Sequence, residues 1–252
     1  MKIITNADDC GISKNVNDKI EEYINKGILS STTIMSNMPF VEDAKRMYDL
    51  YKKDISFGIH LNLSEGRPMT RSQVLLDNGF FLEEQGNIIF NTNNKIHNGK
   101  FTKEEQAAIF NELSAQIDNI LAHGIEYSHI DSHHHIHTRT WMLNILLQLQ
   151  RKYKFSRIRR LRNYMPFSIQ RCKRNGWWYL MKSRTRNLRS TDYFTSFEDI
   201  IKQANNGFVI NNATIELMTH PGGKNSDTER IIMESIDLGK RFNAEIINYN
   251  QI

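Results

Sequence analysis

The sequence predicts an α/β fold built on a mainly parallel sheet, and two patterns support this prediction. Short apolar runs alternate along the chain with longer amphipathic runs, as strands alternate with helices in such folds. Polar residues that can bind metals follow several of the apolar runs, and the carboxyl ends of parallel strands are where such folds build their sites. These patterns are compatible with an open sheet and with a closed barrel.

Length and composition favour one globular domain. The chain has 252 residues, 39% of them hydrophobic, and no linker divides it, so we expect a single domain over residues 1–252. Residues 65–100 have weak periodicity and predict a loop insertion with a hairpin around "GFFLEEQGNIIF". No signal peptide or membrane-spanning run is visible and two cysteines are too few for a disulfide framework, which predicts a soluble, cytoplasmic protein.

The expected elements follow from the same periodicities. Strands are predicted at "KIITNA", "ISFGIHLNL", "EYSHID" and "ATIELMTH". Helices are predicted over residues 15–26, 103–123, 140–152 and 196–205, the second of them opened by the capping signal "TKEE" at Thr102.

All four predicted strands lead into metal-capable side chains. The first ends in Asp8 and Asp9, the second carries His60, the third carries Asp131 and the last ends at His220. Each alone has a simpler interpretation, such as a helix cap, a half-buried histidine or the start of a turn. Agreement among four strands favours a common site at the carboxyl edge of the sheet.

The run "HIDSHHHIH" at residues 129–137 contains five of the nine histidines. Its position within the chain argues against an expression tag, and its isoleucines argue against a solvated metal-scavenging tract. Alternation along a strand would place Asp131, His133, His135 and His137 on one face. The run therefore predicts an ordered site.

These residue types point to metal chemistry. Imidazoles and a carboxylate suit zinc and comparable first-row ions, and a catalytic site keeps one position open for water. One aspartate and two histidines as ligands would leave a spare carboxylate at the pair Asp8 and Asp9, and a spare imidazole at His220. One group to accept a proton and one to donate it is what amide hydrolysis requires.

Four motifs, "NADDCG", "GIHLNLSEG", "HIDSHHHIH" and "MTHPGG", resemble in order those of the YdjC-like carbohydrate deacetylases, also called chitooligosaccharide deacetylases. The resemblance covers residues 3–223, more weakly over residues 65–100 and the basic segment described below. It implies a distorted (β/α) barrel of mainly parallel strands, a divalent metal ion (magnesium or zinc) and removal of N-acetyl groups from sugars.

The resemblance also implies residue roles. Asp9, His60 and His133 match the metal ligands, Asp8 the catalytic base and His220 the catalytic acid. His135 and His137 match further positions, which we assign to substrate binding. An N-acetylated sugar is the expected partner, and a homodimer is compatible with the sequence.

Residues 151–189, here called the basic segment, contain fourteen Lys or Arg and no Asp or Glu. Its aromatic residues Trp177, Trp178 and Tyr179 could stack on sugars or on bases, so a metal-dependent nucleic-acid-binding protein is the alternative function. A solvated, lid-like excursion is the simpler interpretation. Arg159 and Arg160 are the residues of this segment that we expect to reach the substrate.

A cysteine hydrolase is disfavoured. Cys10 directly follows two aspartates, and their negative charge opposes formation of a thiolate.

Overall fold

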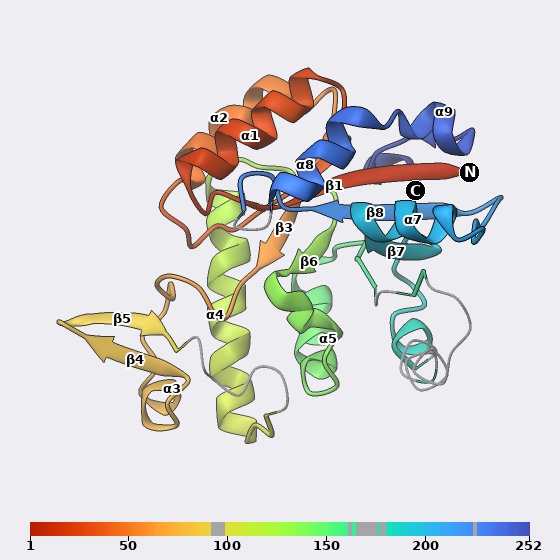
Figure 1. The fold of residues 1–252 in the computed structure, drawn as a ribbon. Coiled ribbons are helices and arrows are strands. Elements are labelled where there is room, and N and C mark those ends of the chain that lie inside the picture. Colours follow the sequence, from red (N-terminus) through yellow and green to blue (C-terminus); the bar gives the residue numbers. More distant parts are fainter. Residues whose placement is uncertain (92–98, 161–162, 165–175, 177–179, 224–225) are drawn as a thin grey trace.

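The structure is a computed structural model that describes residues 1–91, 99–160, 163–164, 176, 180–223 and 226–252. Its centre is a parallel sheet in the order β6-β3-β2-β1-β8-β7, to which β9 adds a short pairing with β1 (Figure 1). The strands are β1 Lys2–Cys10, β2 Ser31–Ile34, β3 Ser56–Leu61, β6 Ile130–Ser132, β7 Tyr193–Ser196, β8 Thr214–Thr219 and β9 Glu245–Ile246.

Two short described stretches, residues 157–160 and 163–164, contact the two outer strands of this sheet. Ile158 forms a parallel bridge with Ile130 of β6, while the backbone N–H groups of Asn163 and Tyr164 donate to the carbonyl of Phe194 in β7 at 3.2 and 3.4 Å. The sheet thereby curls into an irregular barrel. The predicted fold class, a distorted (β/α) barrel of mainly parallel strands, is confirmed.

The helices cover the outside of the curled sheet (Figure 1). Ser13 caps α1 by accepting a hydrogen bond from Val16 N, and Thr102 and Glu105 form the predicted capping box of α4. The helices of this layer are α1 Lys14–Asn25, α2 Val41–Tyr51, α4 Lys103–Ala122, α5 Met142–Tyr153, α7 Phe197–Asn205, α8 Ser226–Ser235 and α9 Leu238–Phe242. None of the helices in the described part of the chain is long and apolar enough to cross a membrane.

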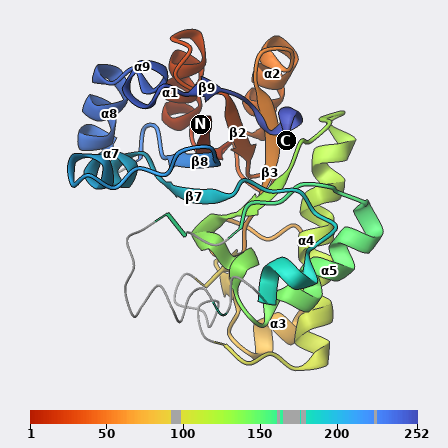
Figure 2. The same cartoon turned by 90° about the vertical axis from the view of Figure 1, so that its right-hand side faces the viewer.

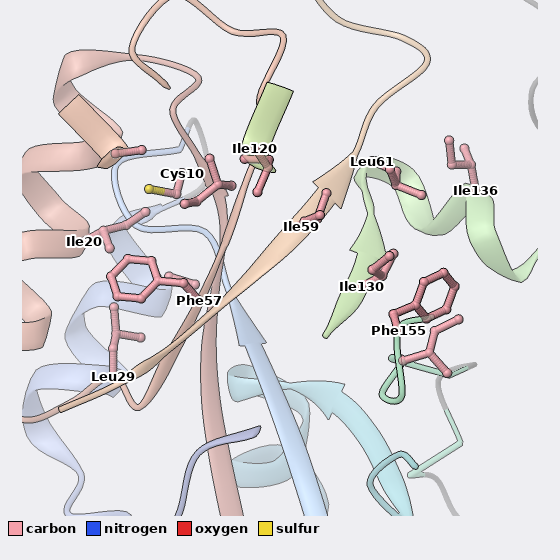
Figure 3. Packing of buried hydrophobic residues seen from close by; sticks show 14 of the residues in the cluster. Cys10, Ile20, Leu29, Phe57, Ile59, Leu61, Ile120, Ile130, Ile136 and Phe155 are labelled. Atoms are coloured by element: carbon pink, nitrogen blue, oxygen red, sulfur yellow. The ribbon is translucent and has the colours of Figure 1, made fainter. Parts of the chain in front are cut away.

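The apolar core lies between the sheet and these helices. Figure 3 shows Cys10, Ile20, Leu29 and Phe57 gathered beside the first helices, and all four are buried. The two ends of the chain meet near β1, because Glu245 N donates to the carbonyl of Met1 at 3.0 Å (Figure 2). Burial of this apolar surface is the main force that holds helices and sheet together.

The described part of the predicted insertion, residues 65–91 and 99–100, contains regular structure. It contains α3 Gln73–Asp77 and the antiparallel pair of β4 Phe81–Glu84 and β5 Asn87–Phe90, so the predicted hairpin is confirmed (Figure 1). Buried Glu112 of α4 anchors the segment by accepting hydrogen bonds from the backbone of Met69 and Thr70 at 3.0 and 2.8 Å.

Candidate metal and catalytic site

An irregularity in β1 places both aspartates at the site. Neighbouring residues of a regular strand point to opposite faces. Between Ala7 and Cys10, however, β1 gains one residue relative to β2, and Asp9 adopts a φ of 66°, in the left-handed region. The bulge turns Asp9 so that it and Asp8 both reach groups at the carboxyl edge of the sheet.

Asp9, His60 and His133 converge on one point. Asp9 Oδ1 lies 3.2 Å from His60 Nε2 and 2.8 Å from His133 Nδ1. One carboxylate oxygen and two imidazole nitrogens suit zinc and related first-row ions. The three residues predicted as metal ligands are therefore brought together.

A buried carboxylate orients the imidazole of His60. Its Nδ1 lies 2.6 Å from Asp131 Oδ1, which leaves Nε2 facing Asp9. Burial alone lowers the pKa of His60, but the negative charges of Asp131, Asp9 and Asp8 raise it to about 10. This surplus of negative charge favours a cation at the site, and a carboxylate behind a ligating histidine is a common arrangement in metal sites.

The histidine run does not continue the strand, so the predicted alternation is wrong. β6 ends at Ser132, and residues His133–Thr138 form a kinked 3-10 turn in which His134 and His135 have φ values of 53° and 54°. The turn separates the histidines: His133 faces Asp9, whereas His137 points inward and its Nε2 lies 3.0 Å from the backbone carbonyl of Arg159.

Asp8 is held by a buried arginine. Arg159 NH1 and NH2 donate to the two oxygens of Asp8 at 2.8 and 2.7 Å, and the Asp8 side chain is only 2% exposed. Burial would raise the pKa of Asp8, but the charge and hydrogen bonds of Arg159 outweigh this effect and hold the pKa well below its ordinary value. Asp8 is therefore ionised throughout the neutral range.

His220 faces Asp8 from the end of β8. Its Nε2 lies 4.0 Å from Asp8 Oδ2, beyond hydrogen-bond distance, and its side chain is 43% exposed. The turn that carries it is fixed from two sides: Glu229 Oε2 accepts from His220 N at 3.0 Å, and Asn15 Nδ2 donates to the Gly222 carbonyl at 3.1 Å.

These groups line one pocket of about 810 Å³. His135 also lines it; burial lowers the pKa of His135 to about 3, and its Nδ1 is buried with no hydrogen-bond partner among the described residues. Much of the remaining wall is apolar or glycine, including Ile12, Val16, Met218, Gly222 and Gly223. The pocket therefore has one wall of aspartates and histidines and another wall that is largely apolar.

The two arginines predicted to contact substrate do not line this pocket. Arg159 is fully buried and surrounded by the carboxylates of Asp8, Asp131 and Glu216. Arg160 is 9% exposed, and its NH2 donates to the carbonyls of Thr185 and Leu188. Their positions favour structural and positioning roles, because both guanidinium groups are already engaged within the protein.

Two further expectations have different outcomes. Cys10 is fully buried and burial raises the pKa of its thiol to about 12, so it is not a nucleophile. Trp177, Trp178 and Tyr179, the aromatic residues of the basic segment, lie outside the described residues.

Several residues that shape the site are absent from the sequence-based predictions. Thr33 joins His60 and Asp131 through Oγ1 at 3.2 Å from each, and Glu229 fixes the turn of His220. Glu216 had a usable signal, because a glutamate stands in the apolar strand "TIELMT". A charged residue in such a run needs a buried partner.

The fold and the site define a parallel α/β barrel with a His- and Asp-rich centre at the carboxyl ends of its strands. The chain belongs to the YdjC-like protein family, whose model matches residues 2–246.

Curated relatives carry a more specific description. A carbohydrate deacetylase of Halalkalibacterium halodurans is 36% identical over 153 residues, which cover 61% of this chain and 61% of the relative. A carbohydrate deacetylase of Thermoanaerobacter pseudethanolicus is 28% identical over 224 residues, 87% of this chain and 80% of the relative. The match thus spans about three fifths of the first relative's length and a larger part of the second.

A solved structure has the same fold. A protein of Enterococcus faecalis, provisionally described as a cellobiose-phosphate cleavage protein, superposes with a TM-score of 0.71 at 21% identity. The superposition covers 99% of this chain and 98% of that protein.

Proposed function

We propose that this protein is a metal-dependent carbohydrate deacetylase that hydrolyses the acetamide of N-acetylated sugars, chitooligosaccharides among them. The observation that carries the proposal is the convergence of Asp9, His60 and His133 beside Asp8 and His220 in one pocket. The names of the curated relatives support it, and they favour a sugar over nucleic acid as the substrate.

Asp9, His60 and His133 would hold the divalent ion. Two imidazole nitrogens and one carboxylate oxygen fit zinc better than magnesium, which prefers oxygen ligands. When bound, such an ion polarises the acetamide carbonyl and lowers the pKa of water to about 7. The surplus of carboxylates around His60 would balance the positive charge of the ion.

Asp8 would act as the proton acceptor. Water attacks the carbonyl carbon and must lose a proton, and Asp8 is ionised beside the ligand Asp9. The fork of Arg159 fixes both carboxylate oxygens, so Asp8 meets the substrate in one orientation. Oδ2, the oxygen nearer to His220, is the atom we assign to accept the proton.

His220 would act as the proton donor. The carbon–nitrogen bond breaks only when the sugar nitrogen takes up a proton, because an amide anion is a poor leaving group. His220 follows β8, which lies on the other side of β1 from β3, the strand of His60. It can therefore protonate the nitrogen while Asp8 holds the proton from water, and the products are acetate and the free amine.

The test is release of acetate from N-acetylglucosamine and its dimer by the purified protein. We expect release that a chelator abolishes and that added zinc restores, with at least ~10²-fold less release by Asp8→Asn. Release that is absent with both sugars under metal-loaded conditions, or that is unaffected by Asp8→Asn, would contradict the proposal.

A further inference from the structure

We propose that Glu216 and Tyr249 are positioning residues for catalysis, which act by holding Arg159 in the orientation that presents Asp8. The inference rests on the proposed function, in which Asp8 accepts the proton. Neither residue lines the catalytic pocket, and neither belongs to the proposed metal ligands. Their effect on the reaction must therefore pass through the guanidinium.

Arg159 is held on two edges. One edge, formed by NH1 and NH2, donates to the two oxygens of Asp8. On the other edge Nε lies 2.7 Å and NH2 lies 2.6 Å from Glu216 Oε1. Because the guanidinium is planar and rigid, fixing the Nε edge also fixes the direction of the edge that binds Asp8.

The contact between Glu216 and Arg159 is shielded from solvent. Glu216 is fully buried in β8, and Arg159 is fully buried as well. Arg159 NH1 also lies 2.7 Å from Asp131 Oδ2, so a second carboxylate competes for the guanidinium. Without Glu216 the guanidinium would be free to rotate toward Asp131 and away from its paired contact with Asp8.

Tyr249 holds the second carboxylate oxygen of Glu216. Its hydroxyl donates to Glu216 Oε2, the oxygen that Arg159 does not use. The tyrosine itself is constrained, because its ring stacks on His129 with centroids 3.5 Å apart and its backbone N–H donates to Ser56 Oγ at 3.1 Å. Burial raises the pKa of Glu216 to about 7, which agrees with a carboxylate that depends on these few donors.

The four side chains form one chain of contacts: Tyr249 to Glu216, Glu216 to Arg159 and Arg159 to Asp8. Buried ionic clusters contribute little to stability relative to an apolar replacement. Stability alone therefore does not explain why these four side chains are polar, whereas the orientation of Asp8 does.

The first arm of the test is kinetic and uses the metal-loaded protein. The variants are Tyr249→Phe, Glu216→Gln and Glu216→Met. The control is Tyr48→Phe: Tyr48 is a buried tyrosine of α2, and its hydroxyl accepts a hydrogen bond from Glu126 N at 3.1 Å. We expect kcat for acetate release to fall about 3–10-fold in Tyr249→Phe and about 10²-fold in Glu216→Met. Glu216→Gln keeps an acceptor for Arg159 and should recover most of the loss, while KM and metal content stay unchanged throughout.

The second arm does not need activity. The Nε–H resonance of Arg159 in ¹⁵N NMR reports the contact with Glu216 directly. We expect it to shift and to exchange faster with solvent in Tyr249→Phe, and to stay unchanged in Tyr48→Phe.

The two arms separate the hypotheses. A wild-type protein that releases no acetate refutes the proposed function, and the resonance of Arg159 then decides the positioning role. An unchanged resonance in Tyr249→Phe, or wild-type kcat in folded, metal-loaded Tyr249→Phe, overturns the inference. Should Glu216→Met fail to fold, Tyr249→Phe still decides the matter because it removes a single oxygen atom.

Discussion

The barrel has two regions of ionisable side chains: the mouth, which is the pocket at the carboxyl ends of the strands, and the floor, which is the buried cluster beneath it. At the mouth, Asp9, His60 and His133 direct their ligand atoms toward a common point, and His220 is partly exposed. On the floor, the charged groups of Arg159 and Glu216 are fully buried and engaged with one another. In the proposed mechanism, the groups that bind the metal ion are thus separate from the groups that orient Asp8.

His60 belongs to both regions. Its Nδ1 faces the buried Asp131, and its Nε2 faces Asp9 at the mouth. The contact with Asp131 therefore fixes the orientation of the imidazole that faces the candidate metal site. The predictions below test whether the two regions can be separated by mutation.

The largest effect is expected at the mouth. Asp9→Asn and His133→Ala should each remove bound metal and lower kcat/KM by about 10⁴-fold, because they delete a ligand. Glu65→Gln is the matched control: Glu65 lies near His133 and His134 in a second ligand grouping that does not include Asp9. Metal analysis of the purified variants decides, and metal loss in Glu65→Gln with full occupancy in Asp9→Asn would move the ion to that second grouping.

The next effect should leave the metal in place. Asp8→Asn and His220→Ala should each lower kcat by about 10²–10⁴-fold, the usual scale for general acid–base groups. Metal content and KM should remain near those of the wild type, because neither side chain is a proposed ligand. A His220→Ala variant with normal kcat would show that another residue donates the proton.

The floor should make the protein sensitive to acid. Burial lowers the pKa of both His129 and His137 well below the ordinary value, so these side chains stay neutral in the folded state. His135, whose pKa burial lowers to about 3, stays neutral in the folded state as well. Below pH ~6.5 the unfolded chain binds the protons of these three histidines, whereas Glu216, with a pKa of about 7, keeps one extra proton in the folded state. The unfolded state therefore holds a net excess of two protons, three from the histidines less one from Glu216. The free energy of unfolding should decrease by about 2.7 kcal/mol per pH unit between pH ~6.5 and ~4.5.

Urea denaturation of the metal-free protein at pH 6.5 and 5.0 measures this slope. His129→Gln should remove about half of the dependence, because one of the two excess protons is lost, and His123→Gln, beside Glu42 at the end of α4, should leave it unchanged. Equal or greater stability of the wild type at pH 5.0 would refute the assignment of neutral histidines to the floor.

The smallest effect on catalysis is expected at Arg160. Arg160→Ala should lower the melting temperature by a few degrees, since its guanidinium holds the carbonyls of Thr185 and Leu188. Its kcat and KM should change less than about 2-fold. An increase in KM with an unchanged melting temperature would restore the substrate contact that the sequence predicts.

The sequence predicts the mouth better than the floor, for a physical reason. Strand ends carry visible changes from apolar to polar residues, so Asp9, His60 and His220 can be found from the pattern alone. The residues that fix Arg159 cannot be found in this way, because they are distant in the sequence. Glu216, which contacts Arg159, lies 57 residues after it, and Tyr249, which contacts Glu216, lies 90 residues after it.

Local backbone geometry is the other limit of the sequence. The period of a strand predicted one face for His133, His135 and His137, but the kinked turn overrides it. The helix predictions held better: α1, α4, α5 and α7 lie within two residues of the expected bounds. The single-domain organisation, the cytoplasmic location and the homodimer stay predictions.

The bulge in β1 carries a consequence for how this fold can change. Asp9 stands at a φ of 66°, where a glycine would be relaxed and a residue with a Cβ costs about 1 kcal/mol. Asp9→Gly should therefore remove this backbone cost, and it would also remove the contacts of Asp9 with His60 and His133. The strained backbone position and the proposed ligand thus fall on one residue, so any substitution of Asp9 changes the stability of β1 and the composition of the site together.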